Sequence, residues 1–344
     1  MDFLSFFIIC VKVLLVFAGT LLAVLIMVYA ERRVSAFMQG RLGPNRVGPQ
    51  GLLQPIADGI KFLMKEDIIP DGVNKPIYLL APVIMLIPAL MTFAVIPFGS
   101  TITLFDRDII LQVADVNIGI LYILALTSIG VYGIVLAGWA SNSKYTLIGG
   151  LRSSAQLISY ELALGLSVVS IILMSGSLRL NDIVADQQGH LLSWYVFKQP
   201  LAFLIFLIAT YAETNRLPFD LAEAEQELVG GYHTEYSSMK FAMFFMSEYA
   251  NMITAAALTV TLFFGGWDVP LLDEKSLGIW GAMLSVASFI LKMGFFLFLF
   301  IWIRWTFPRF RYDQLMKLGW KVLLPLSLIN IFITGGYLTL AALK

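Results

Sequence analysis

The sequence predicts an all-α, polytopic membrane protein that forms a single membrane domain over residues 1–344. Mean hydropathy is +0.83, and only 13% of the residues are charged, about half the share of a typical soluble domain. Apolar stretches long enough to cross a bilayer recur from end to end. The net charge of zero argues against a nucleic-acid partner. We expect about eight transmembrane helices and one interfacial amphipathic helix.

Eight apolar stretches are the predicted spans. They lie near residues 3–29, 77–98, 117–140, 155–177, 194–212, 240–265, 278–303 and 319–342. The fifth is the least regular, because Lys198 interrupts its outer end. Pro82, Pro88 and Pro325 fall within spans, where neighbouring helices can satisfy the freed backbone groups, so we expect kinks rather than helix ends.

The charged loops predict the orientation. Sixteen Lys and Arg residues fall on the face that includes residues 30–76 and 304–321, and five fall on the opposite face. The positive-inside rule places the sixteen on the cytoplasmic or matrix face. Both termini are therefore expected on the periplasmic or intermembrane side.

The loop after the first span has two parts. Residues 40–51 read GRLGPNRVGPQG, and this alternation of Gly and Pro predicts turns. Residues 52–66 read LLQPIADGIKFLMKE, with apolar residues at helical spacing on one face. A segment this short cannot span, so residues 52–65 are predicted to form an amphipathic helix in the membrane interface. A simple surface anchor would explain the apolar stripe but not the Gly/Pro/Arg segment before it.

Three ionisable residues lie well inside predicted spans: Glu161, Glu248 and Lys292. A charge at the centre of a spanning helix costs on the order of 2.5–3.5 kcal/mol on insertion scales. We interpret the three as parts of an internal polar network. A structural ion pair, such as Glu248 with Lys292, is the alternative. Lys12 in the first span can snorkel outward and is set aside.

An acidic stretch separates the fifth and sixth spans. Residues 217–231 read LPFDLAEAEQELVGG and contain Asp220, Glu223, Glu225 and Glu227 without a base. Helix capping explains Asp220 and Glu223, which form a D-x-x-E arrangement. It does not require Glu225 and Glu227. Closely spaced carboxylates raise one another's pKa when partly desolvated, so proton handling is the more specific interpretation.

Other chemistry is not indicated. The chain has one cysteine, Cys10, and two histidines, His190 and His233, both in predicted loops. This leaves no thiolate cluster for iron–sulfur binding and no intramembrane histidine pair for haem. No glycine-rich nucleotide motif and no metal-ligand cluster is apparent. The residues point to a proton-conducting or quinone-contacting part of a larger assembly, or to a transporter.

Three segments resemble a known family. They read ERRVSAFMQGRLGPNRVGPQGLLQPIADGIKFLMKEDIIP (31–70), GWASNSKYTLIGGLRSSAQLISYEL (138–162) and AETNRLPFDLAEAEQELVGGYHTEYSSMKFAMFFMSEYANM (212–252). The first and last closely resemble the signature regions of the quinone-site membrane subunit of respiratory complex I. That family comprises the H subunit of bacterial NADH:quinone oxidoreductase and mitochondrial subunit 1. Motifs of this length are highly specific.

The resemblance implies a subunit of a proton-pumping, translocating enzyme. Hydrophilic-arm subunits would share the quinone chamber, and small membrane and antiporter-like subunits would be further partners. NADH, FMN and iron–sulfur clusters would belong to partner subunits, with no cofactor bound in this chain and quinone as substrate. The location implied is the bacterial inner membrane or the mitochondrial inner membrane. The residues that the resemblance assigns to the chamber are Glu31, Arg32, Arg41, Arg46, Ala57, Asp58 and Phe62.

The resemblance also implies a carboxylate path for protons. Glu213, Glu223, Glu225 and Glu227 would start it near the chamber, and Glu161 and Glu248 would continue it into the membrane, with Lys292 as a basic member. Some family members carry a further carboxylate in the third span, where this chain offers only Tyr132 in the middle of the span. We hypothesise that quinone reduction shifts the loop 213–239 and the protonation of its carboxylates.

Two alternatives remain from the sequence. One is the corresponding subunit of a related membrane-bound hydrogenase or of a plastoquinone-reducing complex. The chamber motif at residues 40–64 argues against a hydrogenase, which need not bind quinone. The other is a proton-coupled transporter, which would need a midplane substrate site between broken helices.

Overall fold

The computed structural model describes residues 3–104, 107–221, 229–270 and 278–343. Within these residues, seven helical units are long and apolar enough to cross a membrane. They are α1 (Phe3–Met38), α3 (Lys75–Met91), α4 (Gly119–Ala140), α5 (Lys144–Ser175), α10 (Ser238–Phe263), α11 (Ile279–Thr306), and a last unit of α12 (Tyr312–Leu318), the π-helical turn η6 (Gly319–Leu323) and α13 (Leu324–Ala342). The prediction of a helical polytopic membrane protein is confirmed.

The fifth predicted span forms shorter helices. A one-turn helix, α7 (Tyr195–Lys198), is separated by Gln199 from α8 (Pro200–Glu213). At 1.5 Å per residue, α8 is roughly 21 Å long, less than the ~30 Å hydrocarbon core. Its apolar residues pack inside the bundle rather than facing lipid alone. Before α7 come the short α6 (Leu180–Ala185) and η3 (Leu191–Ser193).

A β-hairpin that was not predicted from the sequence lies between the second and third spans. Strands β1 (Thr101–Leu104) and β2 (Arg107–Ile110) pair antiparallel, with Thr101 opposite Ile110. Two helices also run beyond the predicted limits: α1 continues to Met38 and α5 begins at Lys144. Hydropathy detects only the apolar part of a helix, whereas the backbone hydrogen bonds continue into the polar region.

The amphipathic helix predicted at residues 52–65 is α2 (Gln54–Met64), preceded by the turn η1 (Pro49–Gly51). The Ser238 hydroxyl, at the start of α10, shares its one donor between the carbonyls of Phe62 (2.9 Å) and Lys65 (3.0 Å). The rings of Phe62 and Phe241 lie 6.1 Å apart. These contacts fix the end of α2 against α10, while most of its apolar face stays exposed.

Helix α10 is the centre of the bundle. It is the most buried of the long helices, and α1, α3 and α11 pack against it. Small and hydroxylated residues let the backbones approach closely, as is usual between membrane helices. The Ser247 hydroxyl donates to Met85 O (2.9 Å), and the Thr254 and Thr92 hydroxyls lie 2.9 Å apart. Thr92 begins the short η2 (Thr92–Val95) that follows α3.

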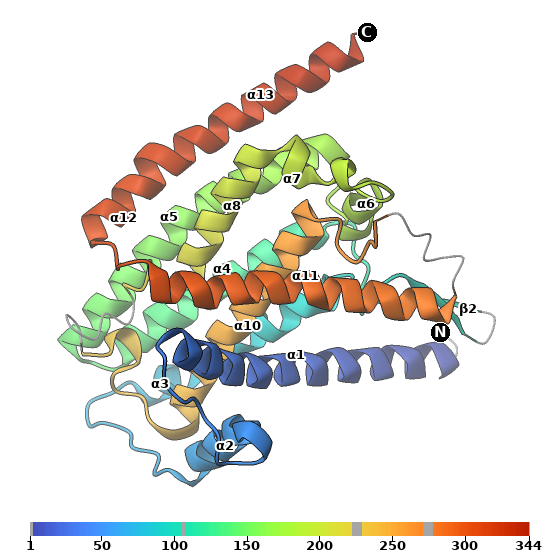
Figure 1. Cartoon of the computed structure of the whole chain (residues 1–344). Helices are drawn as coiled ribbons and strands as arrows, with labels where there is room; N and C mark the ends of the chain where they lie inside the picture. Colours follow the sequence, from blue (N-terminus) through green and yellow to red (C-terminus); the bar gives the residue numbers. More distant parts are fainter. Residues whose placement is uncertain (1–2, 105–106, 222–228, 271–277, 344) are drawn as a thin grey trace.

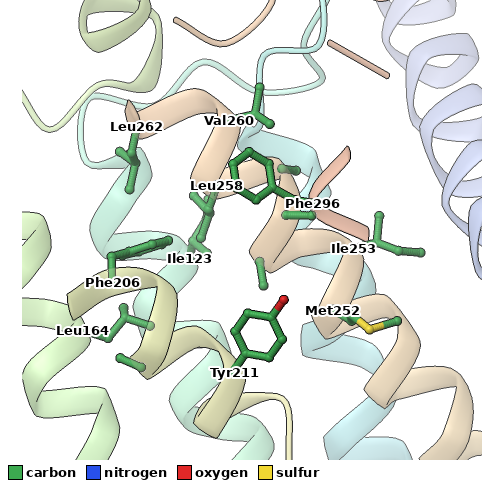
Figure 2. Close-up of a cluster of buried hydrophobic side chains, with 14 of the residues drawn as sticks. Ile123, Leu164, Phe206, Tyr211, Met252, Ile253, Leu258, Val260, Leu262 and Phe296 are labelled. Atoms are coloured by element: carbon green, nitrogen blue, oxygen red, sulfur yellow. The ribbon is translucent and has the colours of Figure 1, made fainter. Parts of the chain in front are cut away.

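A cluster of buried apolar side chains joins α10 to its neighbours (Figure 2). Phe206 and Tyr211 enter it from α8, and Phe296 enters from α11. The ring of Tyr211 lies 4.0 Å from that of Phe300. This cluster is the main apolar core, and it fixes α8 relative to α10 and α11.

Both described chain ends and the β-hairpin lie towards the same end of the bundle, while α2 and α12 lie away from it (Figure 1). The loops rich in Lys and Arg therefore gather at the end opposite the termini. This agrees with the predicted placement of the termini on one common face. The side of the membrane that each face contacts stays a prediction.

One close approach between α5 and the loop before α10 has a testable consequence. A Cβ atom at Gly149 in α5 would lie 2.8 Å from Gly231 Cα and 2.9 Å from Tyr232 N. Gly149→Ala should therefore push the loop at Gly231 away from α5 and destabilise the protein by about 1–3 kcal/mol. The measurement is the thermal-unfolding midpoint of the purified complex. Gly165→Ala, in the same helix with nothing within 4 Å, is the matched control, and equal midpoints for the two variants would contradict this packing.

Candidate functional site

Three of the predicted proton-path carboxylates line one small cavity. Glu161 on α5, Glu213 at the end of α8 and Glu248 on α10 surround it, together with Thr127 of α4 and Asn251 of α10. The cavity has about 20 Å³ of space for water, above the roughly 10–15 Å³ that one water molecule needs. A second cavity of the same size shares Thr127, Glu213 and Asn251 with it. The tertiary structure thus brings together carboxylates that lie as far as 87 residues apart in the chain.

Each of two carboxylates has a defined hydroxyl partner. The Ser128 hydroxyl on α4 donates to Glu161 Oε1, and the Tyr232 hydroxyl donates to Glu248 Oε1 at 2.9 Å. From the sequence, only Tyr132 was expected as a polar group in the middle of this span. The structure shows that Tyr132 is 66% exposed, whereas Ser128 of the same helix contacts the Glu161 carboxylate and Thr127 lies beside Glu213. Ser128 and Glu161 lie 33 residues apart on different helices, so no local pattern signalled their contact.

Tyr232 is positioned by the loop before α10. It belongs to the short helix η4 (Gly231–His233), which lies against α5. The neighbouring His233 packs against the rings of Phe241 and Phe245. Burial lowers the pKa of His233 to about 4, so this imidazole is neutral near pH 7. A neutral ring avoids placing a cation beside Tyr232, the hydrogen-bond partner of Glu248.

Glu31, predicted to line the quinone chamber, is the centre of a buried polar junction. It lies near the C-terminal end of α1 and is 7% exposed. Its carboxylate accepts hydrogen bonds from Arg304 of α11, from Arg216 Nη1 at 3.3 Å and from the Tyr249 hydroxyl at 2.7 Å. The Arg216 guanidinium also stacks 4.5 Å from the centre of the Tyr249 ring. None of these three partners was predicted from the sequence.

The acidic stretch is only partly described. Asp220 is buried and accepts from Arg309 Nη2 at 2.8 Å, which ties the segment after α8 to the region before α12. Phe310 N also donates to Pro218 O at 3.1 Å. Glu223, Glu225 and Glu227 lie outside the described residues, so their proposed roles and the predicted capping arrangement stay predictions.

The other predicted chamber residues lie on the end of α1, the following loop and α2. Arg32 pairs with Asp58, which also accepts from Gln54 Nε2 at 3.3 Å. This contact joins α1 to α2 across the Gly/Pro loop. Arg41 is exposed and donates to the Gln39 side chain (2.7 Å), and Arg46 is exposed. Ala57 and Phe62 are half-buried on α2.

Lys292 lies apart from the carboxylate cavity. Its ammonium donates to three carbonyls after α10: Phe264 (2.9 Å), Gly266 (3.1 Å) and Asp268 (2.7 Å). Phe264 is roughly 24 Å along the helix direction from Glu248, at 1.5 Å per residue. The suggested pairing of Glu248 with Lys292 is therefore wrong. Burial raises the pKa of the Asp268 carboxyl, and the Lys292 charge opposes that rise.

Most of the predicted site residues that the structure describes fall into two neighbouring polar regions. Within the part of the chain that the structure describes, no three His, Cys, Asp or Glu side chains gather where they could hold a metal ion. The two regions are the junction around Glu31 and the cavity lined by Glu161, Glu213 and Glu248. Residues 248 and 249 are adjacent on α10, so one turn of this helix contacts both.

Comparison with known proteins decides the family. The sequence profile described as NADH dehydrogenase matches residues 11–335. The chain belongs to the NADH dehydrogenase family. It is 58% identical over 335 residues to NADH-quinone oxidoreductase H subunit 1 of Geobacter sulfurreducens, covering 94% of this chain and 93% of the relative. The H subunit 2 of the same enzyme from Geobacter metallireducens shows equal identity and coverage.

More distant relatives carry the same name. The H subunit 1 of Cytophaga hutchinsonii is 50% identical over 330 residues, with 94% of this chain and 95% of the relative covered. The expected resemblance to the H-subunit family is confirmed. Members of this family from three bacteria thus align over nearly the whole chain, including the segments that hold Glu31, Glu161, Glu213 and Glu248.

The buried histidine predicts a pH dependence. Its unfolded-state pKa is 6.5 and its folded-state value is about 4, so only the unfolded chain binds this proton between the two. The free energy of unfolding should therefore fall by about 1.4 kcal/mol for each pH unit below 6.5 on account of this group. Thermal-unfolding midpoints of the purified complex between pH 7 and pH 5 measure this.

His233→Phe keeps an aromatic ring packed against Phe241 and Phe245 and should flatten that decline. His190→Gln, which changes the only other histidine, at an exposed position, should leave the decline as in the wild type. If the unfolding midpoint declines as steeply in His233→Phe as in the wild type, the His233 imidazole of the wild type takes up its proton in the folded protein as well, and the prediction is wrong.

Proposed function

We propose that this chain acts as the membrane-embedded H subunit of a proton-pumping NADH-quinone oxidoreductase. In this role it forms much of the quinone chamber and couples quinone reduction to proton translocation through its carboxylates. Relatives with this name align with the chain over nearly their full length. Other subunits of that complex are then its partners, and they supply NADH oxidation, FMN and the iron–sulfur clusters. The seven apolar helices fit a multi-pass protein of a bacterial inner membrane.

The cavity shared by Glu161, Glu213 and Glu248 is the observation that carries the coupling role. Three carboxylates from three helices line space for water, and water held there can relay a proton between neighbouring carboxylates. A buried charged carboxylate is costly in a membrane, and sharing protons among neighbours lowers that cost. This is the arrangement that a proton path needs and a purely structural ion pair does not.

The junction around Glu31 supports a link between the chamber and this cavity. Arg32, the next residue of α1, contacts α2, while Glu31 contacts Tyr249 of α10. A change of charge in the chamber would act on Arg32, Glu31 and Arg216, and hence on the α10 turn that also carries Glu248. The segment from Glu213 to Asp220 connects the same two regions along the chain.

The alternatives gain less support. The names of the relatives include quinone, which favours a quinone-reducing complex over a hydrogenase. A transporter needs a polar substrate site, and ligand sites commonly measure about 300–1,000 Å³. The two cavities that the described residues form beside Glu213 have space only for single waters.

Replacing a cavity carboxylate tests the coupling role. Glu161→Gln or Glu213→Gln in the assembled complex should lower NADH-driven quinone reduction and proton pumping on the order of tenfold or more, because an amide cannot exchange the proton. Reduction is followed as NADH oxidation, and pumping as acidification of proteoliposomes. Asp186→Asn, at an exposed carboxylate outside the cavity, is the control. Full pumping in both cavity variants with normal assembly would refute the role.

Replacing Arg32 tests the chamber. Arg32→Met removes the contact with Asp58 and a permanent charge, so the KM for quinone should rise about tenfold with a smaller change in kcat. Lys144→Met, at the exposed first residue of α5, should leave KM unchanged. A quinone analogue that labels residues 32–62 in the wild type should label this variant less. An unchanged KM together with unchanged labelling would remove Arg32 from the chamber.

A further inference from the structure

A third cavity, larger than the two beside the carboxylates, belongs to neither polar region. It measures about 280 Å³ and lies on the outside of the bundle between α1 and α3, near the N-terminal part of α1. Almost all of its lining is apolar, and several lining side chains are about half exposed. The lining consists of Val13, Val16, Phe17, Ile87, Leu90, Met91, Ala94 and Val113. We call this surface the α1–α3 groove.

The wall of the groove that contains Val113 is held in place by buried hydrogen bonds. Gln112, next to Val113, is buried; its Nε2 donates to Val95 O, and its Oε1 accepts from Asn181 (2.6 Å). The backbone of Ala114 donates to Ala94 O at 2.9 Å. The groove is therefore formed in advance, as is usual for sites that bind small molecules.

The ammonium group of Lys12 lies at one edge of the groove. Lys12 precedes the lining residue Val13, and its ammonium donates to Ile110 O (2.7 Å) and to Gln112 O (3.2 Å), beside Val113. A lysine within an apolar span is uncommon and costly unless it serves a purpose. An ammonium carries three N–H donors, and these two carbonyls occupy two of them. The third can reach a further acceptor at the groove edge.

We propose that the α1–α3 groove binds one acyl chain of an anionic phospholipid, whose phosphate accepts a hydrogen bond from Lys12. Both halves of the site match that molecule. An apolar groove on a spanning helix pair faces hydrocarbon rather than water, and a chain that fills it adds dispersion contacts. The ammonium supplies a charge-assisted hydrogen bond to a phosphate oxygen. The lipid would lie in the leaflet on the side of both termini, away from the proposed chamber.

A photoreactive lipid tests the site. The assembled complex is placed in nanodiscs of zwitterionic phosphatidylcholine that contain a trace of phosphatidylglycerol with a diazirine in its acyl chain. After irradiation, crosslinked peptides are mapped, and unlabelled phosphatidylglycerol or phosphatidylcholine is added as competitor. Phe332 of α13, which is 77% exposed, reports ordinary contact with bulk lipid.

We expect crosslinks at residues 13–17 and 87–91 whose yield saturates with the concentration of the photoreactive lipid. Unlabelled phosphatidylglycerol should displace this lipid about tenfold better than phosphatidylcholine does, a difference in binding free energy near 1.4 kcal/mol. Lys12→Met should abolish this preference, and Lys12→Arg should retain it. Val16→Phe, or Met91→Trp if the first does not assemble, should fill the groove and reduce the crosslinks. Lys198→Met, an exposed lysine at the start of the fifth apolar stretch, is the matched control.

Other results would overturn the proposal. Crosslinks that match those at Phe332 in yield and in competition would show ordinary bilayer contact. Their absence from the wild type would show that a helix of another subunit covers the groove. A preference for phosphatidylglycerol that survives Lys12→Met would show that Lys12 only anchors the segment 110–112. NADH-driven quinone reduction should be normal in Lys12→Met, which separates this site from the proposed chamber.

Discussion

The burial of Glu31 is the constraint on which the rest of the site depends. A carboxylate in a low-dielectric interior is tolerated only when donors surround it, and removing one partner of such a group costs about 3–5 kcal/mol. Here the donors come from α10, from α11 and from the segment after α8. Satisfying one side chain therefore fixes the positions of four segments that are distant in sequence.

Helix α10 carries this constraint to the carboxylate cavity. Tyr249 contacts Glu31, and the preceding residue, Glu248, lines the cavity with Glu161 and Glu213. The second cavity is also lined by apolar side chains of the cluster in Figure 2, including Phe206 and Leu258. The space for water beside Glu213 thus borders closely packed apolar side chains, which offer a leaking proton no hydrogen-bond partner.

Local patterns explain why much of this could be predicted. Hydropathy located seven helices of spanning length, because a backbone in lipid must satisfy its own hydrogen bonds. Helical periodicity located α2, and the cost of intramembrane charge singled out Glu161 and Glu248. The β-hairpin was missed because its strands are only four residues long. The partners of Glu31 were missed because hydrogen bonds across 185 to 273 residues leave no periodic trace.

By itself, the sequence determined the class of protein, the positions of the apolar helices and which charged residues needed an explanation. Each of these follows from composition or from spacing within one helix. Only the tertiary structure decided which charges meet. It joined Glu161, Glu213 and Glu248 around one cavity and placed Lys292 on the carbonyls after α10 instead. Such pairings depend on how helices pack across the bundle, and that packing is set by side chains from many segments at once.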